Sequence, residues 1–291
     1  MSSGKRFHIG IPTYNGANRV ESCLYSIYKY TDLKEVAITI LDDGSNEQNR
    51  QHMRRLSVQY GIPLIQHDRN YGITKSWNDL VQSDRTDISI LLNDDIYVVQ
   101  NWLHSMVFLL DNSKNIGAVS WDYWFCTHDD MLQKKRNETY DIPPRHHTTK
   151  EILPIKKKVN YLNTPGLVMC PAGCCFAFKR KMYDTVNGFD PSYISFYNES
   201  DFGTKLTQMK YPVFGLPWPK LYHVWGQTFN ENAVALNAGN TMAHDREYYI
   251  QKWGGDFDYT NPKFMTREHL GNHELTWLTP EGPIKRLVWV D

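Results

Sequence analysis

Three consecutive polar residues, Asn93, Asp94 and Asp95, end an apolar run over 88–92. Such a run is typical of a strand buried on both faces, and an unpaired carboxylate beside it is costly. We therefore expect the three side chains in the crevice at the carboxyl ends of the strands, where open α/β sheets bind ligands. Clustered acidic oxygens there suit a divalent cation such as Mg²⁺ or Mn²⁺ shared with a phosphate. A simple strand-to-turn transition is the alternative, because Asn-Asp-Asp also favours turns.

The elements that would position these residues alternate along the first half of the chain. Apolar runs predict strands over 7–11, 36–41, 62–66, 88–92 and 116–120. Helical spacing of apolar residues predicts intervening helices, the clearest over 20–28 and 73–81. Strands separated by helices imply parallel βαβ units whose sheet is covered on both faces. The sequence predicts an α/β fold with a mostly parallel, Rossmann-like central sheet flanked by helices.

The second half is less regular. The segment 126–160 carries eight Lys and Arg residues against five acids, a net charge of +3, at Lys134–Arg136, Arg145, Lys150 and Lys156–Lys158. It is either a solvated loop or a lid that binds an anionic partner. After this segment the sequence predicts further elements: a strand over 171–178, helices over 179–186 and 204–210, and strands over 211–216 and 221–226. We expect a domain over 5–226, made of halves 5–120 and 161–226 around the basic insert 126–160. Residues 227–291 form a C-terminal extension, packed on the core or acting as an oligomerisation arm.

Composition bounds the kind of protein. Hydrophobic residues make up 41% and charged residues 22% of the 291, which is ordinary for a globular protein. The 32 basic and 32 acidic residues cancel, so a nucleic-acid acceptor or an anionic membrane is disfavoured. The five cysteines lack CxxC spacing, which favours reduced thiols over disulfides or zinc. With no apolar signal region and no run long enough to span a membrane, we expect a soluble, cytoplasmic protein.

Six short segments then follow the order of a known family. They are Ile11–Asn15, Leu41–Ser45, Arg69–Gly72, Leu92–Ile96, Gly188–Asp190 followed by Asn198–Gly203, and Tyr222-His223. This order resembles the family 2 glycosyltransferases of the GT-A fold over about residues 6–226, with Asn93–Asp95 as a DxD-type motif. The resemblance implies an inverting transfer of a sugar from a nucleoside diphosphate donor to a hydroxyl acceptor, such as a glycan or another polymer.

The resemblance also implies a donor site. In it, Pro12 and Tyr14 hold the nucleobase, and Asp43 accepts from a uracil N3–H, which favours a UDP- or TDP-linked donor. A helix N-cap or a turn residue is the alternative role for Asp43. Lys75 and Asn78 reach ribose or phosphate, or else are surface or capping residues. The full set of expected donor-binding residues is Pro12, Thr13, Tyr14, Asn15, Asp43, Asn70, Lys75, Asn78, Asn93, Asp94 and Gly173.

Two further roles concern the metal and the base. Asp95 is the expected ligand of Mn²⁺ or Mg²⁺, with His223 as a second ligand or as a structural histidine. Inversion requires a carboxylate that takes the proton of the acceptor hydroxyl. Where the family often has Glu-Asp followed by another acid, this chain has Asn198-Glu-Ser-Asp201, so Glu199 stands at the base position and Asp201 at the later acid. Either can be the base, and both can instead cap a helix that starts near residue 202.

Two other functions remain open. A sugar nucleotidyltransferase would need a glycine-rich, basic loop after the first strand. The segment 12–17 has one glycine and no basic residue, which argues against this function. A catalytically inactive relative that binds nucleotide sugars or glycans would keep the fold without turnover. The acids at 43, 95, 199 and 201 favour the enzyme, whereas the departure at Glu199 keeps the inactive relative open.

Overall fold

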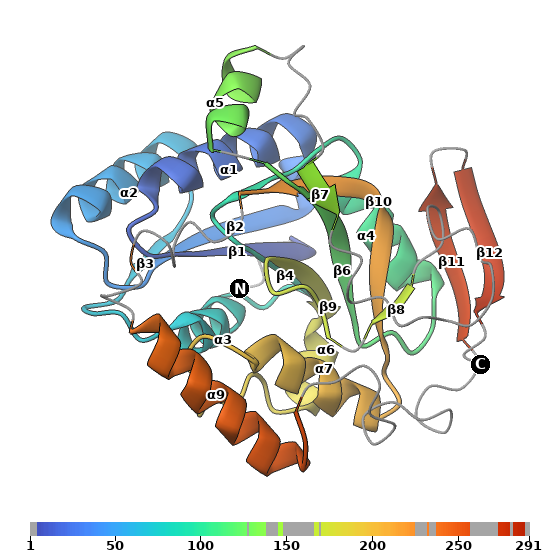
Figure 1. Cartoon of the computed structure of the whole chain (residues 1–291). Helices are drawn as coiled ribbons and strands as arrows, with labels where there is room; N and C mark the ends of the chain where they lie inside the picture. The colour runs from blue at the N-terminus through green and yellow to red at the C-terminus, as the bar shows by residue number, and fades with distance from the viewer. Residues whose placement is uncertain are drawn as a thin grey trace.

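The computed structural model describes residues 5–126, 128–137, 145–147, 166–168, 170–224, 232, 237–256, 273–279 and 282–288. One large sheet runs through the middle of the molecule, with its strands in the order β3-β2-β1-β4-β9-β6-β10-β5 (Figure 1). Its strands are β1 Phe7–Thr13, β2 Val36–Asp42, β3 Leu64–Gln66, β4 Ile88–Leu92, β5 Ile96–Tyr97, β6 Ala118–Phe125, β9 Cys175–Lys179 and β10 Val213–His223, with β7 Arg145–His147 and β8 Gly166–Val168 paired at its side.

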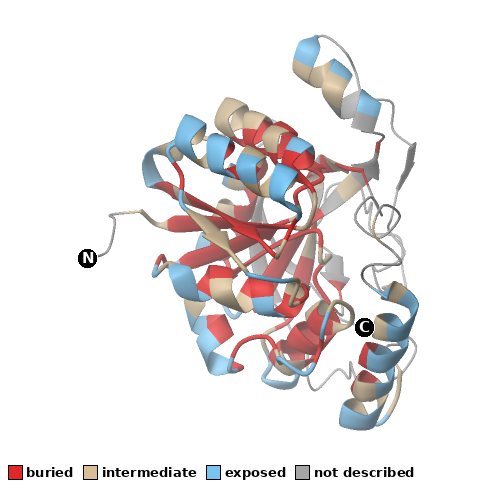
Figure 2. Cartoon of the chain, turned by 90° about the vertical axis from the view of Figure 1, so that its left-hand side faces the viewer, coloured by how far each residue is buried: buried red, intermediate tan, exposed pale blue. Residues whose placement is uncertain are grey.

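Helices cover both faces of this sheet. The described helices are α1 Ala17–Tyr30, α2 Glu47–Tyr60, α3 Ile73–Ser83, α4 Trp102–Asn112, α5 His128–Arg136, α6 Arg180–Thr185, α7 Asn198–Gln208 and α9 Ala238–Trp253, with a short 3₁₀ turn at Leu33–Glu35. Helices α1, α2 and α4 bury their apolar sides against one face of the sheet, and α3, α6 and α7 against the other. The buried residues accordingly gather on the strands and on the inward sides of these helices (Figure 2).

The strand directions confirm the mostly parallel α/β fold. Strands β2, β1 and β4 run parallel, with Phe7 opposite both Val36 and Ile88. Strand β9 is antiparallel to its neighbours β4 and β6, and β6 then runs parallel to β10. Because β1, β2 and β4 end at the same edge, the polar residues that follow them meet there.

The structure corrects several predicted boundaries. Helix α7 begins at Asn198 rather than at 204, because Tyr197 adopts a left-handed conformation and the Asn198 side chain accepts the amide of Glu199 at 3.0 Å. The two strands predicted over 211–226 form the single strand β10, whose register shifts between Leu216 and Leu221. Strand β6 continues to Phe125, well past its predicted end, and the predicted strand over 171–178 starts only at Cys175.

The insert and the extension are partly described. Helix α5 of the insert lies on α1, where Lys135 pairs with Glu21 at 2.9 Å. The basic positions Lys150 and Lys156–Lys158 lie outside the described residues. In the extension, α9 packs beside α7, and a hairpin of β11 His273–Thr279 and β12 Gly282–Val288 lies beside α4 (Figure 1). Among the described helices, none combines the length and the apolar character that crossing a membrane requires.

Candidate active site

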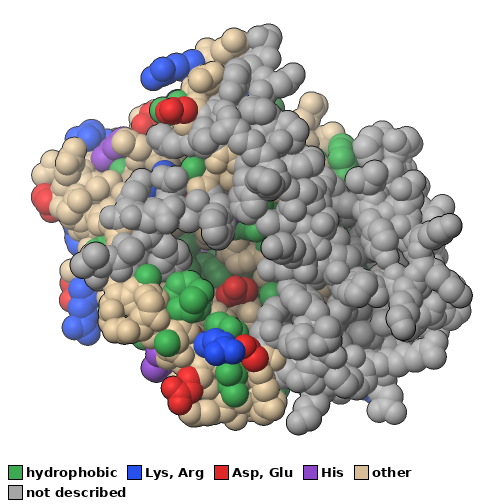
Figure 3. Space-filling model, viewed as in Figure 1, with side chains coloured by type: hydrophobic (Ala, Val, Ile, Leu, Met, Phe, Trp, Pro, Cys, Tyr) green, Lys and Arg blue, Asp and Glu red, His purple; other side chains and the backbone are tan. Residues whose placement is uncertain are grey.

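A cavity of about 660 Å³ lies at the carboxyl ends of β1, β2 and β4. It also reaches the loop before β9, the start of α7 and the start of α9. Figure 3 shows one face of the molecule, near the middle of which acidic and hydrophobic side chains lie next to each other. The predicted residues that line it are Pro12, Thr13, Tyr14, Asp43, Asn70, Asn93, Asp94, Asp95, Gly173, Glu199 and His223. The structure therefore brings together residues from seven separate parts of the sequence.

Asp94 is buried and held by the strand beside it. Its Oδ2 accepts the Thr13 hydroxyl at 2.6 Å, and Nε of Arg19 lies 3.2 Å from its Oδ1. Burial raises the pKa of Asp94 to about 6, against the lowering effect of the Arg19 charge, and the neighbouring Asp95 carboxylate adds to the rise. Contacts within the protein thus fix the orientation of this carboxylate at the cavity wall.

Asp95 faces His223 across the cavity floor. Nε2 of His223, at the end of β10, lies 3.2 Å from Oδ1 of Asp95, and both residues are buried. Burial lowers the pKa of His223, but the Asp95 carboxylate outweighs it and holds that pKa well above its usual value. Burial raises the pKa of Asp95, and the His223 charge in turn brings it below its usual value. The pair is electrostatically coupled at the place where the sequence predicts a metal.

Asp95 and His223 together offer an oxygen and a nitrogen atom that could form part of a divalent cation site. The buried Oδ1 of Asp95 accepts no hydrogen bond of good geometry, and it lies opposite Nε2 of His223. A carboxylate oxygen of this kind is a ligand that a hard cation prefers. Across the described part of the chain, no three His, Cys, Asp or Glu side chains converge as a complete metal site. Asp95 and His223 would therefore need ligands from elsewhere, such as phosphate oxygens and water.

Asp43 organises the loop that follows β3. Its Oδ1 is 2.7 Å from Nδ1 of His67 and accepts the amide of Tyr71 at 3.0 Å, while its Oδ2 accepts the amide of Gly72 at 2.9 Å. Burial raises the pKa of Asp43, and the hydrogen bond from His67 opposes this rise. Asn46, rather than Asp43, caps α2. The helix-cap alternative is therefore wrong for Asp43. Its carboxylate does hold the turn at Tyr71 and Gly72, and Asp43 also lines the cavity.

Three predicted donor-binding residues do not line the cavity. Asn78 uses its amide to bond Phe189 N, Phe189 O and the Tyr183 hydroxyl, so it holds the loop after α6. Lys75 pairs with Asp79, one turn along α3, at 2.7 Å. Asn15 accepts the amide of residue 46 at 2.9 Å and thereby joins the loops after β1 and β2. At these three positions the structure shows side chains that bind other parts of the protein and do not line the cavity.

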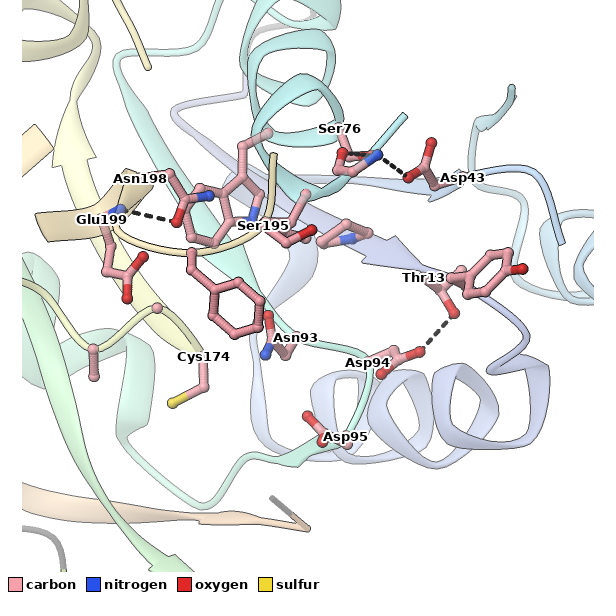
Figure 4. Close-up of a pocket in the computed structure, with 18 of the residues that line it drawn as sticks. Thr13, Asp43, Ser76, Asn93, Asp94, Asp95, Cys174, Ser195, Asn198 and Glu199 are labelled. Atoms are coloured by element: carbon pink, nitrogen blue, oxygen red, sulfur yellow. Dashed lines mark hydrogen bonds between the residues drawn. The ribbon is translucent and has the colours of Figure 1, made fainter. Parts of the chain in front are cut away.

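The two candidate bases lie in different environments. Glu199 lines the cavity at the opposite end from Asp43, with the acids that follow β4 between them (Figure 4). Asp201 is fully buried outside the cavity lining, where it contacts Lys252 at 2.7 Å and accepts Nε1 of Trp253 at 2.9 Å. The two residues are two positions apart on α7 and therefore point about 200° apart around the helix. Of the pair, the structure places only Glu199 next to the cavity.

The cavity wall also contains residues that the sequence did not single out. Among them are Ser76 and Trp77 of α3, Tyr123 of β6, Ser195 and Phe196 before α7, and Ala238, Gly239 and Met242 of α9. Ser195 and Phe196 lie just before the motif that begins at Asn198, which is a usable signal. Helix α9 gives no such signal, because few of its residues are buried and its apolar periodicity is weak.

Comparison with known proteins defines the class. A model of the glycosyl transferase family 2 matches residues 8–186 of this chain. That range is more than half of the chain and contains the ends of β1, β2 and β4. The chain belongs to the glycosyl transferase family 2, and with it to the glycosyltransferases of the GT-A fold, which confirms the family and fold expected from its motifs.

Solved structures share this fold at low identity. A mannosyltransferase from Pyrobaculum calidifontis, in complex with GDP-Man and Mn²⁺, has a TM-score of 0.58 and 18% identity, covering 84% of this chain and 64% of that one. GalNAc-T7 with UDP, GalNAc and Mn²⁺ has a TM-score of 0.60 and 17% identity, covering 90% of this chain and 54% of that one. TarS 1-349 from S. aureus has a TM-score of 0.52 and 15% identity, covering 88% and 74%. The chain thus spans less than two thirds of the length of the mannosyltransferase and of GalNAc-T7. In the comparison with curated proteins, no sequence matches.

Proposed function

We propose that this protein is an inverting, metal-dependent glycosyltransferase that moves a sugar from a UDP- or TDP-linked donor to a hydroxyl group of an acceptor. One observation carries the proposal: a single cavity has Asp43 at one end, Glu199 at the other, and the acids that follow β4 between them. This order matches the order of a bound donor, with the nucleobase at one end, the diphosphate in the middle and the reacting sugar at the other end.

At the nucleobase end, the shape comes from the loops after β1 and β3. Pro12, Tyr14 and Asn70 line the cavity around Asp43. The Asp43 carboxylate is fixed by the amides of Tyr71 and Gly72, and it has remaining acceptor capacity for the N3–H of uracil or thymine. Because its position is set before the ligand arrives, little ordering cost accompanies binding.

In the middle of the cavity, Asp95 and His223 would hold Mn²⁺ or Mg²⁺. When bound, such an ion neutralises the charge that develops on the departing diphosphate. Asp94 stays fixed by Thr13 and Arg19, and with Asn93 it faces the ribose or a water molecule. The structures with Mn²⁺ and a nucleotide or nucleotide sugar support this assignment by similarity of fold.

At the far end, Glu199 accepts the proton of the acceptor hydroxyl. As that oxygen bonds to the anomeric carbon from the side opposite the diphosphate, the bond from this carbon to the phosphate oxygen breaks. The proton stays on Glu199, and the electron pair leaves with the nucleoside diphosphate, so the configuration inverts. The adjacent Gly173 leaves room for the acceptor, because even an added Cβ there would lie 3.4 Å from Cδ of Glu199.

The test is release of nucleoside diphosphate from a panel of donors: UDP-GlcNAc, UDP-GalNAc, a TDP-hexose and GDP-mannose. We expect release from a uridine or thymidine donor, and a loss of at least about 100-fold in Glu199→Gln, because general-base catalysis contributes about that much. Binding of UDP should be unchanged in Glu199→Gln, since only the proton acceptor is removed.

Asp201→Asn provides the comparison. If Glu199→Gln keeps full release while a folded Asp201→Asn loses it, the base is Asp201 and this assignment is wrong. If UDP binds but no donor in the panel is turned over with any offered glycan, the alternative of a catalytically inactive relative that binds nucleotide sugars is favoured instead.

A further inference from the structure

Helix α9, in the C-terminal extension, forms part of the cavity wall. Ala238, Gly239 and Met242 from its first turns line the cavity, and Met242 is 49% exposed. Further along the same side of the helix, Asp245 and Tyr249 are buried against the rest of the protein. The hydroxyl of Tyr249 lies 2.8 Å from that of Thr204 on α7. Helix α9 is therefore attached to the same helix that carries Glu199.

Asp245 binds the backbone of the loop before α7. This carboxylate has no exposed surface. Its Oδ2 accepts the amides of Ser195 at 2.9 Å and Phe196 at 2.8 Å, and its Oδ1 accepts the amide of Ile194 at 3.1 Å. Nδ1 of His244 lies 2.9 Å from the same Oδ1. A buried carboxylate with several backbone donors is a strong, directional anchor, so the loop conformation depends on it.

The loop is connected in turn to Glu199. The carbonyl of Ile194 accepts both the amide and the hydroxyl of Thr74 at 3.2 Å. The Thr74 hydroxyl oxygen accepts Nδ2 of Asn198 at 3.1 Å, and Oδ1 of Asn198 accepts the amide of Glu199 at 3.0 Å. Both Thr74 and Asn198 are buried. A continuous chain of hydrogen bonds therefore runs from the C-terminal extension to the backbone of the candidate base.

We propose that Asp245 is a positioning residue for the transfer reaction: it fixes the 194–196 loop and, through Thr74 and Asn198, the placement of Glu199. The proposal rests on the proposed role of Glu199. It gives the C-terminal extension a function in the active site, because the part of the chain matched by the family ends at 186 and includes neither the loop nor α9. Asp245 itself is not among the residues that line the cavity.

Asp245→Asn is the informative variant. Asparagine keeps the size of the side chain but replaces one acceptor oxygen with an NH₂ group, which cannot accept the amides of Ser195 and Phe196. We expect amide hydrogen exchange over 194–199 to become at least about tenfold faster, because local opening of the loop is no longer opposed. We also expect kcat for release of UDP from the best UDP-sugar to fall about 10- to 100-fold through misplacement of Glu199. The Kd for UDP should change by less than about threefold, because Asp43 and the loop that it holds are fixed by bonds that do not involve Asp245.

Two further variants make the test specific. Tyr248→Phe, on the same helix, removes only the bond to Asp190 at 3.0 Å, and it should leave exchange over 194–199 and UDP release unchanged. Thr74→Val breaks the chain at its middle. It should reproduce the loss in kcat, and combining it with Asp245→Asn should add less than the sum of the two effects.

The outcomes separate this proposal from the proposed function. Unchanged exchange at Glu199, or full kcat, in a folded Asp245→Asn overturns the role of Asp245. Strictly additive losses with Thr74→Val overturn the connection through Thr74. Failure of the wild-type protein to bind any nucleoside diphosphate counts against the proposed function, and the exchange measurement still decides whether Asp245 controls the segment 194–199.

Discussion

At the scale of single residues, the polar positions at strand ends could be predicted, and the roles of polar positions on helices could not. Thr13, Asp43 and Asp94 follow apolar runs, so the local pattern alone brings them to one edge of the sheet. Asn78 was expected at the donor, but its amide is matched by groups more than a hundred residues away. Asp201 pairs with Lys205 on its own helix, but its other close partners, Lys252 and Trp253, lie on α9. Such partners belong to the tertiary structure and leave no local signal.

Two glycines of the cavity wall give a matched pair of predictions. An added Cβ at Gly173 would meet Cδ of Glu199 at 3.4 Å and Trp77 at 3.5 Å, which are ordinary contacts. Gly173→Ala should therefore change the free energy of unfolding by less than about 0.5 kcal/mol. We expect it to slow release of nucleoside diphosphate about tenfold, because the methyl group occupies the space beside the base where near-attack geometry is set.

Gly72→Ala should behave in the opposite way. Gly72 has a φ of +92°, and an added Cβ would lie 2.5 Å from the carbonyl oxygen of Ile194. We expect a loss of about 2 kcal/mol or more in the free energy of unfolding, measured by urea denaturation. A Gly173→Ala protein that is as unstable as Gly72→Ala would contradict the described packing around Glu199.

At the scale of elements, the βα units were predictable and the C-terminal helix was not. Strands β1, β2 and β4 and helices α1 and α3 have strong apolar periodicity, which tertiary packing then satisfies. The first turn of α7 contains Asn198, Glu199 and Asp201, which read as a polar loop, and its start depends on the backbone of Tyr197. Helix α9 is held mainly by polar contacts, which hydrophobic periodicity does not reveal.

One of these contacts predicts a pH dependence. Asp190, in the loop after α6, accepts Nζ of Lys252 at 2.6 Å and the Tyr248 hydroxyl at 3.0 Å. Partial burial raises the pKa of Asp190, but the hydrogen bonds from Lys252 and Ser192 outweigh it and lower the pKa to about 2. The folded-state pKa is below the unfolded value of 3.8, so the ionised group stabilises the fold above about pH 4. This contribution is lost as the pH falls through about 2.

Asp190→Asn measures this contribution. At neutral pH the variant should be about 1 kcal/mol less stable than the wild type, a modest value because the pair is partly exposed to solvent. The difference should shrink as urea denaturation is repeated at decreasing pH between about 5 and 2.5. A difference that stays constant over this range would show that the charge of Asp190 does not hold α9 in place.

At the scale of the whole molecule, the cavity joins parts of the chain that the family match includes and parts that it does not. The Asp43 end and the acids after β4 come from the ends of β1, β2 and β4, within residues 8–186, whereas Glu199, His223 and the α9 wall lie beyond. The chain carries no net charge, so recognition of a charged donor depends on local groups rather than on a global field.

The most direct test of the central claim is calorimetric titration of UDP into the wild-type protein with and without Mn²⁺, repeated with Asp95→Ala. We expect binding that strengthens at least about tenfold with Mn²⁺, because the ion offsets the diphosphate charge beside Asp94 and Asp95. Asp95→Ala should lose this metal-dependent gain. If neither UDP, TDP nor GDP binds with or without Mn²⁺, the cavity is not a nucleoside diphosphate site and the account is wrong.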